Sequence, residues 1–237
     1  MINKTNRTAN TNSASRDGAN AARTELVFIL DRSGSMSGLE TDTIGGFNAM
    51  LAKQQAQEGD CRITTVLFDD NYEILHDRLD LAAVLPVTER EYYVRGSTAL
   101  LDAVGKTIEK IVNAQRTSKP DYRADKVLFV ITTDGMENAS RTYTHDDVKR
   151  KIEYQKERYG WEFIFLGANI DAGATAERIG IRRDRSQSFH NDSRGVELNY
   201  RVVGEAIASH RSSPRDAKLS ADWNAEIAAD FRARGGE

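Results

Sequence analysis

The sequence predicts an α/β protein with a doubly wound, Rossmann-like sheet of mostly parallel strands and helices on both faces. Two observations lead to this fold class. Short apolar runs with strand propensity alternate along the chain with segments of helical periodicity, which is the order of elements in a doubly wound sheet. The runs at residues 26–30 and 126–133 also lack polar alternation, which indicates central parallel strands covered by helices on both sides.

The first strand and the first helix are expected at residues 26–30 and 39–55. The strand, LVFIL, is rich in residues that favour buried strands. Along the helix, one stripe recurs at helical spacing and consists of Leu39, Thr43, Phe47, Met50 and Leu51. Gly45 and Gly46 weaken this helix by about 1 kcal/mol each, and we expect them to allow close packing on the sheet.

The next two strands are expected at residues 62–68 and 72–79. The turn Asp69-Asp70-Asn71 that joins them is too short for a crossover connection, so the two strands form an antiparallel hairpin. A second metal site is one interpretation of the acid pair Asp69 and Asp70. We favour a solvated turn, because Asp and Asn are common in such turns.

The remaining elements alternate in the same way after an irregular connection at residues 81–95. Helices and strands are expected in the order helix 99–113, strand 126–133, helix 145–159, strand 161–166, helix 172–179 and helix 195–209. The charged stretch at residues 182–192 has the weakest pattern. It indicates a short edge strand only at residues 186–189.

The chain divides into three regions. Residues 1–23 are polar and rich in Asn, Thr, Ser and Ala, and we expect a disordered tail. Residues 24–209 carry the predicted sheet and its helices, which makes one domain. Residues 210–237 form an extension in which Trp223, Ile227 and Phe231 repeat every four residues, the spacing of a short amphipathic helix. We expect this helix to dock on its own domain or to fray, because aromatic side chains exposed without a partner are a liability.

Polar residues cluster at the ends of the predicted elements. Asp31, Ser33 and Ser35 follow the first strand at alternate positions, Thr98 precedes the helix at 99–113, and Asp134 follows the strand at 126–133. Ligands of open α/β sheets bind at the carboxyl ends of the strands. A helix cap or a turn would explain any one of these residues alone. Their joint placement favours a ligand site.

These residues resemble, in the same order along the chain, the metal-ion-dependent adhesion site of von Willebrand factor type A domains. That site consists of a D-x-S-x-S motif, matched by Asp31, Ser33 and Ser35, a Thr in a later loop, matched by Thr98, and an Asp after a later strand, matched by Asp134. The resemblance covers roughly residues 24–207. It implies that one edge strand runs antiparallel to a mostly parallel sheet.

The resemblance also implies a function. In the family's mode, Ser33 and Ser35 bind a divalent cation directly, Asp31 and Asp134 bind it directly or through water, and Thr98 binds it when a ligand is engaged. Hydroxyl and carboxylate oxygens suit Mg²⁺, Mn²⁺ or Ca²⁺, and we expect Mg²⁺ first. An acidic side chain of a protein partner would complete the coordination. We therefore expect a metal-dependent protein-binding module without catalytic activity.

Two alternative functions remain open. A Mg²⁺-dependent phosphotransferase or phosphatase of the haloacid dehalogenase type also has an Asp at a strand end. It needs a second acid two residues later, where this chain has Ser33. The other alternative is a metal-independent interaction or scaffold domain. Partner binding by such a domain would survive neutralisation of Asp31.

Composition limits the partners and the compartment. The net charge of -3 at pH 7 gives no electrostatic case for nucleic acid or an anionic membrane. No apolar run reaches the length of a membrane span, and residues 1–23 lack the apolar core of a signal peptide. The single Cys61 fits a reducing compartment. We expect a cytoplasmic, bacterial, intracellular-type member of the family, and an ATPase is one candidate partner because some bacterial members work beside ATPases.

Overall fold

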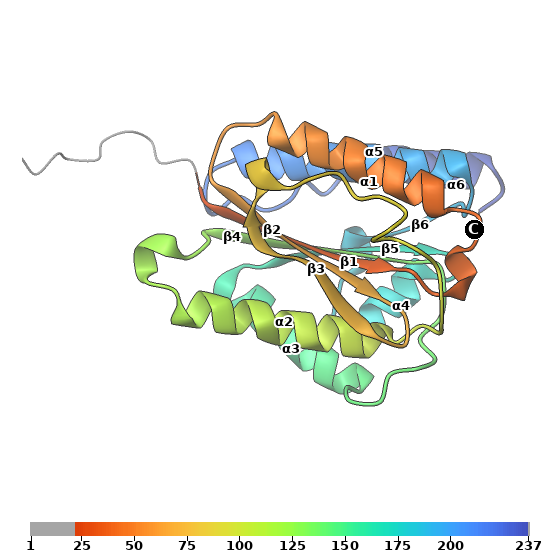
Figure 1. Cartoon of the computed structure of the whole chain (residues 1–237), viewed down its shortest axis with the longest axis horizontal. Helices are drawn as coiled ribbons and strands as arrows, with labels where there is room; N and C mark the ends of the chain where they lie inside the picture. The colour runs from red at the N-terminus through yellow and green to blue at the C-terminus, as the bar shows by residue number, and fades with distance from the viewer. Residues whose placement is uncertain (1–21, 237) are drawn as a thin grey trace, which may run out of the picture.

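A mixed sheet between two layers of helices forms the protein in the computed structural model (Figure 1). The structure describes residues 22–236, so most of the tail expected at residues 1–23 lies outside the described residues. The strands are β1 (Thr24–Asp31), β2 (Cys61–Phe68), β3 (Tyr72–Asp80), β4 (Lys126–Thr133), β5 (Glu162–Ala168) and β6 (Ser186–Phe189). The helices are α1 (Glu40–Gln55), α2 (Leu100–Thr117), α3 (His145–Tyr159), α4 (Ala172–Arg178), α5 (Ser193–Ser212) and α6 (Ala225–Ala233).

The strand order confirms the predicted fold class. It runs β3-β2-β1-β4-β5-β6. Every neighbouring pair is parallel except β2 with β3, so β3 is an antiparallel edge strand. The short strand indicated at residues 186–189 is present as β6, which pairs with Phe165–Ala168 of β5 at the opposite edge.

Helices on the two faces bury alternate residues of the central strands. Leu26, Phe28 and Leu30 of β1 belong to the core that α1, α5 and α6 cover, whereas Val27 and Ile29 belong to the core that α2, α3 and α4 cover. Figure 1 shows these two groups of helices on opposite sides of the sheet. Because both faces are covered, the middle of β1 and of β4 carries consecutive apolar side chains, Leu26–Leu30 and Val127–Ile131, and this explains their lack of polar alternation.

The prediction that Gly46 packs closely on the sheet is wrong. A Cβ atom at Gly46 would lie 2.4 Å from Cδ2 of Tyr200, so this glycine allows α1 to approach α5 rather than the sheet. Gly45, its neighbour, has nothing within 4 Å of the position of a Cβ. The sequence shows that close packing occurs in this helix, but it does not show which element supplies the contact.

The helix expected near the end of the chain is α6, and it docks on its own domain. Trp223 and Ile227 are buried, and Trp223 Nε1 donates a hydrogen bond to the Asp184 carbonyl over 2.9 Å. α6 packs against β6 and α5. α5 itself continues through position 209, where the sequence placed the end of the domain, to Ser212. Within residues 22–236, no helix combines the length and apolarity that crossing a membrane would require.

Candidate metal centre

The five predicted site residues come together at the carboxyl edge of the sheet. β1 and β4 lie side by side and parallel, with Leu30 opposite Thr132, so the residues that follow them emerge at the same edge. The chain continues from these two strands toward opposite edges of the sheet, and ligands of open α/β sheets bind at such a switch point. Asp31 ends β1, and Asp134 follows β4 directly.

Three hydroxyl groups and one carboxylate form a chain of short contacts there. The Thr98 hydroxyl donates to Ser33 Oγ over 3.0 Å, and Ser33 Oγ lies 3.1 Å from Ser35 Oγ. The Ser35 hydroxyl donates to Asp134 Oδ1 over 2.5 Å. Four predicted ligands from three separate loops are therefore linked, each to the next, by side-chain oxygens within hydrogen-bonding distance.

Asp31, the fifth predicted ligand, accepts a hydrogen bond with each of its two carboxylate oxygens. Its Oδ1 accepts the Ser33 N–H at 2.7 Å, and its Oδ2 accepts the Thr133 hydroxyl at 2.5 Å. Burial raises the pKa of the Asp31 carboxyl to about 6, although these hydrogen bonds act in the opposite direction, and the charge of Asp134 also raises it. Asp31 therefore shapes the loop as well as contributing negative charge to the centre.

Two site neighbours, Thr133 and Asn191, were not identified from the sequence. Thr133 donates to Asp31 as described, and Asn191 Nδ2 donates to Asp134 Oδ2 over 3.3 Å. Burial raises the pKa of Asp134, while hydrogen bonds from Ser35 and Asn191 lower it. The signal for Thr133 is its place at the end of a central strand. Asn191 lies two residues beyond Phe189, the end of the weakly indicated strand β6.

The loop that carries Thr98 is fastened to the loop that carries Asp134. Asn138 Oδ1 accepts the Thr98 N–H at 2.9 Å, and the Thr98 carbonyl accepts the N–H groups of Asn138 and Ala139. Gly135 permits the close approach of the two loops, because a Cβ there would lie only 3.1 Å from Ser35 Oγ and from Thr98 Oγ1. A larger residue at position 135 would press on two of the predicted ligands.

The donor set fits a hard divalent cation. It offers oxygen atoms only, from three hydroxyls and two carboxylates, as Mg²⁺ and Ca²⁺ prefer. Asp31 and Asp134 are each 2% exposed, and none of the main causes that shift the pKa values of these two carboxyls is a basic side chain. Two buried carboxylates without a basic partner repel each other, and a bound cation would offset that repulsion. No group of three or more His, Cys, Asp and Glu side chains within residues 22–236 could hold a metal ion, so the centre depends on its hydroxyl groups.

The interpretation of Asp69 as part of a solvated turn is wrong. Asp69 is fully buried, and its Oδ2 accepts the Nε–H groups of Arg32 at 2.9 Å and of Arg95 at 2.8 Å. Its neighbour Asp70 is exposed, as a solvated turn requires. The Asp69 carboxylate is committed to two arginines, and it connects the β2–β3 turn to the loops that carry Ser33 and Thr98.

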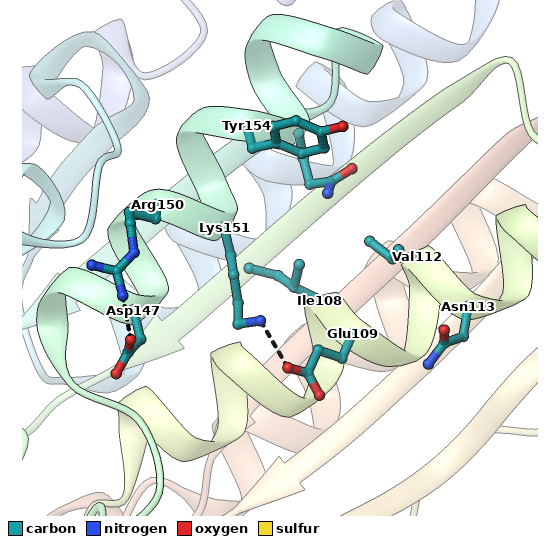
Figure 2. Close-up of a pocket in the computed structure, with 9 residues that line it drawn as sticks. Ile108, Glu109, Val112, Asn113, Asp147, Arg150, Lys151 and Tyr154 are labelled. Carbon is teal, nitrogen blue, oxygen red and sulfur yellow. Dashed lines mark hydrogen bonds and ion pairs between the residues drawn. The ribbon is translucent and has the colours of Figure 1, made fainter.

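A groove between two helices lies apart from this centre. Figure 2 shows it between α2 and α3, where it has a volume of about 520 Å³. Its charged side chains pair with each other, Lys151 with Glu109 at 2.7 Å and Arg150 with Asp147 at 2.6 Å. None of the described residues that line it is a predicted site residue. The two acidic side chains that line this groove are therefore both in ion pairs, and they do not form a second cluster of unpaired carboxylates.

A family model and several solved structures match the chain. The model of the von Willebrand factor type A domain matches residues 25–199. No curated protein matches. The von Willebrand factor domain of the type V pili tip protein Mfa5 from Porphyromonas gingivalis has a TM-score of 0.61 at 11% identity, over 84% of this chain and 99% of that one.

Two other solved structures have the same fold. The pilus adhesin SpaC from Lactobacillus rhamnosus GG, in an open conformation, has a TM-score of 0.61 at 12% identity, over 81% of this chain and 30% of that one. Proximal thread matrix protein 1 from the mussel byssus, with a zinc-occupied MIDAS motif, has a TM-score of 0.53 at 14% identity, over 79% of this chain and 46% of that one. At such identities the likeness establishes the fold, and the chain spans less than half the length of these two proteins.

Proposed function

Because the chain belongs to the von Willebrand factor type A domain family, we propose that it binds a divalent cation and recognises a protein partner through that cation. The ligands would be Asp31, Ser33, Ser35, Thr98 and Asp134. We propose Mg²⁺ as the ion, with Mn²⁺ or Ca²⁺ as alternatives. A dication held by only two charged side chains stays electrophilic, so an Asp or Glu side chain of the partner suits its remaining position.

The chain of hydroxyl contacts that runs from Thr98 through Ser33 and Ser35 to Asp134 is the observation that carries the proposal. A simpler role for Ser33 would be to cap the short 3₁₀ helix Gly34–Met36. Its hydroxyl makes no capping hydrogen bond to that helix. It lies instead within 3.1 Å of the hydroxyls of Ser35 and Thr98. The side chain is thus committed to the shared site, which favours a ligand role over a local structural one.

The comparisons support binding rather than catalysis as the activity of this site. Two of the solved structures with this fold are a pilus tip domain and a pilus adhesin, and the mussel protein holds zinc in its MIDAS motif. Phosphatase chemistry of the haloacid dehalogenase type would need an acid at position 33, and the Ser33 hydroxyl cannot supply the role of a carboxylic acid near neutral pH. We therefore propose that the domain is not an enzyme.

The cellular setting is also a proposal. The single Cys61 is a buried free thiol, and burial raises its pKa to about 12. An unpaired thiol of this kind suits a reducing compartment. We propose a cytoplasmic bacterial protein, and an ATPase that presents an acidic residue at its surface is one candidate partner.

Calorimetric titration of Mg²⁺ and Mn²⁺ into chelator-treated protein tests the metal site. Asp31→Asn keeps the size of the side chain and removes its charge. We expect saturable binding to the unmodified protein and a loss in the variant larger than the roughly 10- to 100-fold that is typical for residues that only support metal ligands. The matched control is Asp121→Asn, which removes one exposed charge in the loop before β4. This loop lies at the amino ends of the parallel strands, away from the candidate site. Equal affinity in Asp31→Asn and Asp121→Asn, or no binding to the unmodified protein, would contradict the proposed site.

A further inference from the structure

Asn191, in the loop that joins β6 to α5, reaches the candidate metal centre. Its Nδ2 donates to Asp134 Oδ2 over 3.3 Å, while Asp134 Oδ1 accepts the Ser35 hydroxyl at 2.5 Å. The two oxygens of one proposed ligand are therefore held by side chains from two different loops. This arrangement restricts the rotation of the Asp134 carboxylate.

The other polar atom of Asn191 is buried without a partner. Asn191 Oδ1 has no hydrogen-bond donor among the described residues. A buried acceptor left unpaired is costly, and native proteins usually satisfy it with water or another group. A water molecule that is bound to a divalent cation is a strong donor, because the cation polarises its O–H bonds. A water on a cation at this centre would therefore supply the hydrogen-bond donor that Asn191 Oδ1 lacks.

The residues on either side of Asn191 hold it in place. The His190 ring packs on the Phe231 ring of α6 with centroids 4.8 Å apart, and His190 Nε2 lies 3.1 Å from the Phe231 carbonyl oxygen. Asp192 caps α5 by accepting the Gly195 N–H at 2.8 Å, and it pairs with Arg234. The loop is therefore fixed by α5 and α6, and the Asn191 side chain is positioned without help from a metal.

A turn residue is the simpler explanation for an Asn in a loop. Turn asparagines usually bond to their own backbone within two or three residues. The hydrogen bond that the Asn191 side chain makes within residues 22–236 instead reaches Asp134, 57 positions away. The side chain therefore connects the end of β6 to the end of β4, which a turn does not require.

We propose that Asn191 is a sixth residue of the metal centre, a positioning residue that orients Asp134 and accepts a hydrogen bond from a water on the cation. This inference rests on the metal-dependent function proposed above. It extends the site from the three loops that carry Ser33, Thr98 and Asp134 to the loop that follows β6. The surroundings of the ion then include one carboxamide that the five-residue motif does not contain.

Titration with Mn²⁺ of three variants, beside the unmodified protein, tests this role. Asn191→Leu removes both polar atoms and keeps the number and branching of the side-chain heavy atoms, and we expect Mn²⁺ binding to weaken by about 10- to 100-fold. The matched control is Asn224→Leu, which removes a half-buried Asn that donates to Ser186 and Gln187 of the same strand β6. It should leave the affinity unchanged. Asn191→Asp should lower the melting temperature in EDTA, because it places a second carboxylate beside Asp134, and should increase the rise in melting temperature that Mn²⁺ produces.

A merely structural role for Asn191 predicts a different result. Asn191→Leu would then melt earlier in EDTA but bind Mn²⁺ as tightly as the unmodified protein, and this outcome overturns the inference while the proposed metal site stands. If Asn191→Leu does not fold, Asn191→Asp decides, because a Mn²⁺-induced rise no larger than that of the unmodified protein overturns the inference as well. Failure of the unmodified protein to bind Mn²⁺ overturns both the inference and the proposed function.

Discussion

Arg32 lies between two proposed metal ligands in the sequence, yet its side chain belongs to an ion-pair cluster in which Arg32 and Asp69 are fully buried. It donates to Asp69 at 2.9 Å and to Glu73 at 2.7 Å, and Arg95 donates to the same Asp69 oxygen at 2.8 Å. Burial acts to raise the pKa of Asp69, but hydrogen bonds, led by that from Arg95, hold it below its usual value. The cluster therefore keeps a fully buried carboxylate ionised directly beside the loops that carry the proposed metal ligands.

Removal of the Arg32 charge should destabilise the fold strongly. Arg32→Met keeps most of the aliphatic stem but leaves Asp69 with Arg95 as its remaining ion-pair partner. Because the buried Asp69 carboxylate then loses one of its two arginine partners, we expect a loss of about 3 kcal/mol in the free energy of unfolding. Urea unfolding in EDTA at pH 7 measures this loss.

The exposed pair of Arg182 with Asp184 provides the control, since these side chains are 67% and 39% exposed. Arg182→Met should cost less than about 1 kcal/mol. If the two arginine variants unfold at the same urea concentration, the buried cluster does not carry the stability assigned to it.

The motif resemblance, together with the ends of recognisable strands and helices, identified the five candidate ligands, but not the groups that hold them. A Ser or an Asp at the end of a buried strand is visible in the sequence, because the strand itself is recognisable from its apolar run. The pairing of Arg32 with Asp69 spans 37 positions, and that of Asn191 with Asp134 spans 57. Such contacts depend on how the loops fold over one another, and no local pattern encodes them.

At the scale of elements, apolar periodicity located the helices and strands but not all of their ends. α2 was expected to stop at residue 113 and continues to Thr117, where the Ser118 N–H still bonds to the Ala114 carbonyl at 3.1 Å. Its last turn carries no apolar stripe, so periodicity cannot register it. β6 is weak in sequence because only four residues pair there and two of them are Ser. In the folded protein, α6 packs against this short edge strand.

The docking of α6 should make a measurable contribution to stability. Ile227 is 1% exposed, and α6 covers the edge strand β6, whose unpaired backbone groups would otherwise face solvent. Ile227→Ala removes buried methyl groups and leaves a cavity, so we expect the free energy of unfolding to fall by about 2–4 kcal/mol. Urea unfolding monitored by circular dichroism measures this change.

Leu85→Ala is the matched control for this prediction, because it deletes a side chain of the same size that is 78% exposed. It should change the free energy of unfolding by less than about 0.5 kcal/mol. An equal, small effect of both variants would mean that α6 does not stabilise the domain.

On the scale of the whole molecule, the sheet separates two buried polar groups of opposite character. Asp31 and Asp134 lie at the carboxyl ends of β1 and β4, whereas Lys126 begins β4 and donates to the carbonyls of His210 and Ser213 at 2.5 Å. Burial raises the pKa of Asp31 to about 6. Burial lowers the pKa of His210 to about 4, and the charges of Lys126, Lys218 and Arg185 lower it further. The two edges of the sheet therefore respond to acid in opposite ways.

The sign of each response follows from the pKa difference between the folded and unfolded states. Asp31 binds a proton more readily when folded, since its folded pKa of about 6 exceeds the ordinary value of 3.8, so its contribution to stability increases as the pH falls from about 6 to 3.8. His210 binds a proton more readily when unfolded, with an ordinary pKa of 6.5 and a folded pKa of about 4. Its contribution is full above pH 6.5 and is lost as the pH falls to about 4.

His210→Gln should isolate the loss that His210 causes. The carboxylates are common to both proteins, so their contributions cancel in the difference between the two free energies of unfolding. As the pH is lowered from 7 to 4, we expect the unmodified protein to lose on the order of 3 kcal/mol more free energy of unfolding than the His210→Gln variant loses. Urea unfolding in EDTA at half-unit steps of pH measures the profile. A difference that stays constant over this range would mean that His210 takes up its proton equally well in the folded and unfolded chains, and that burial at the amino edge of the sheet does not exclude its charge.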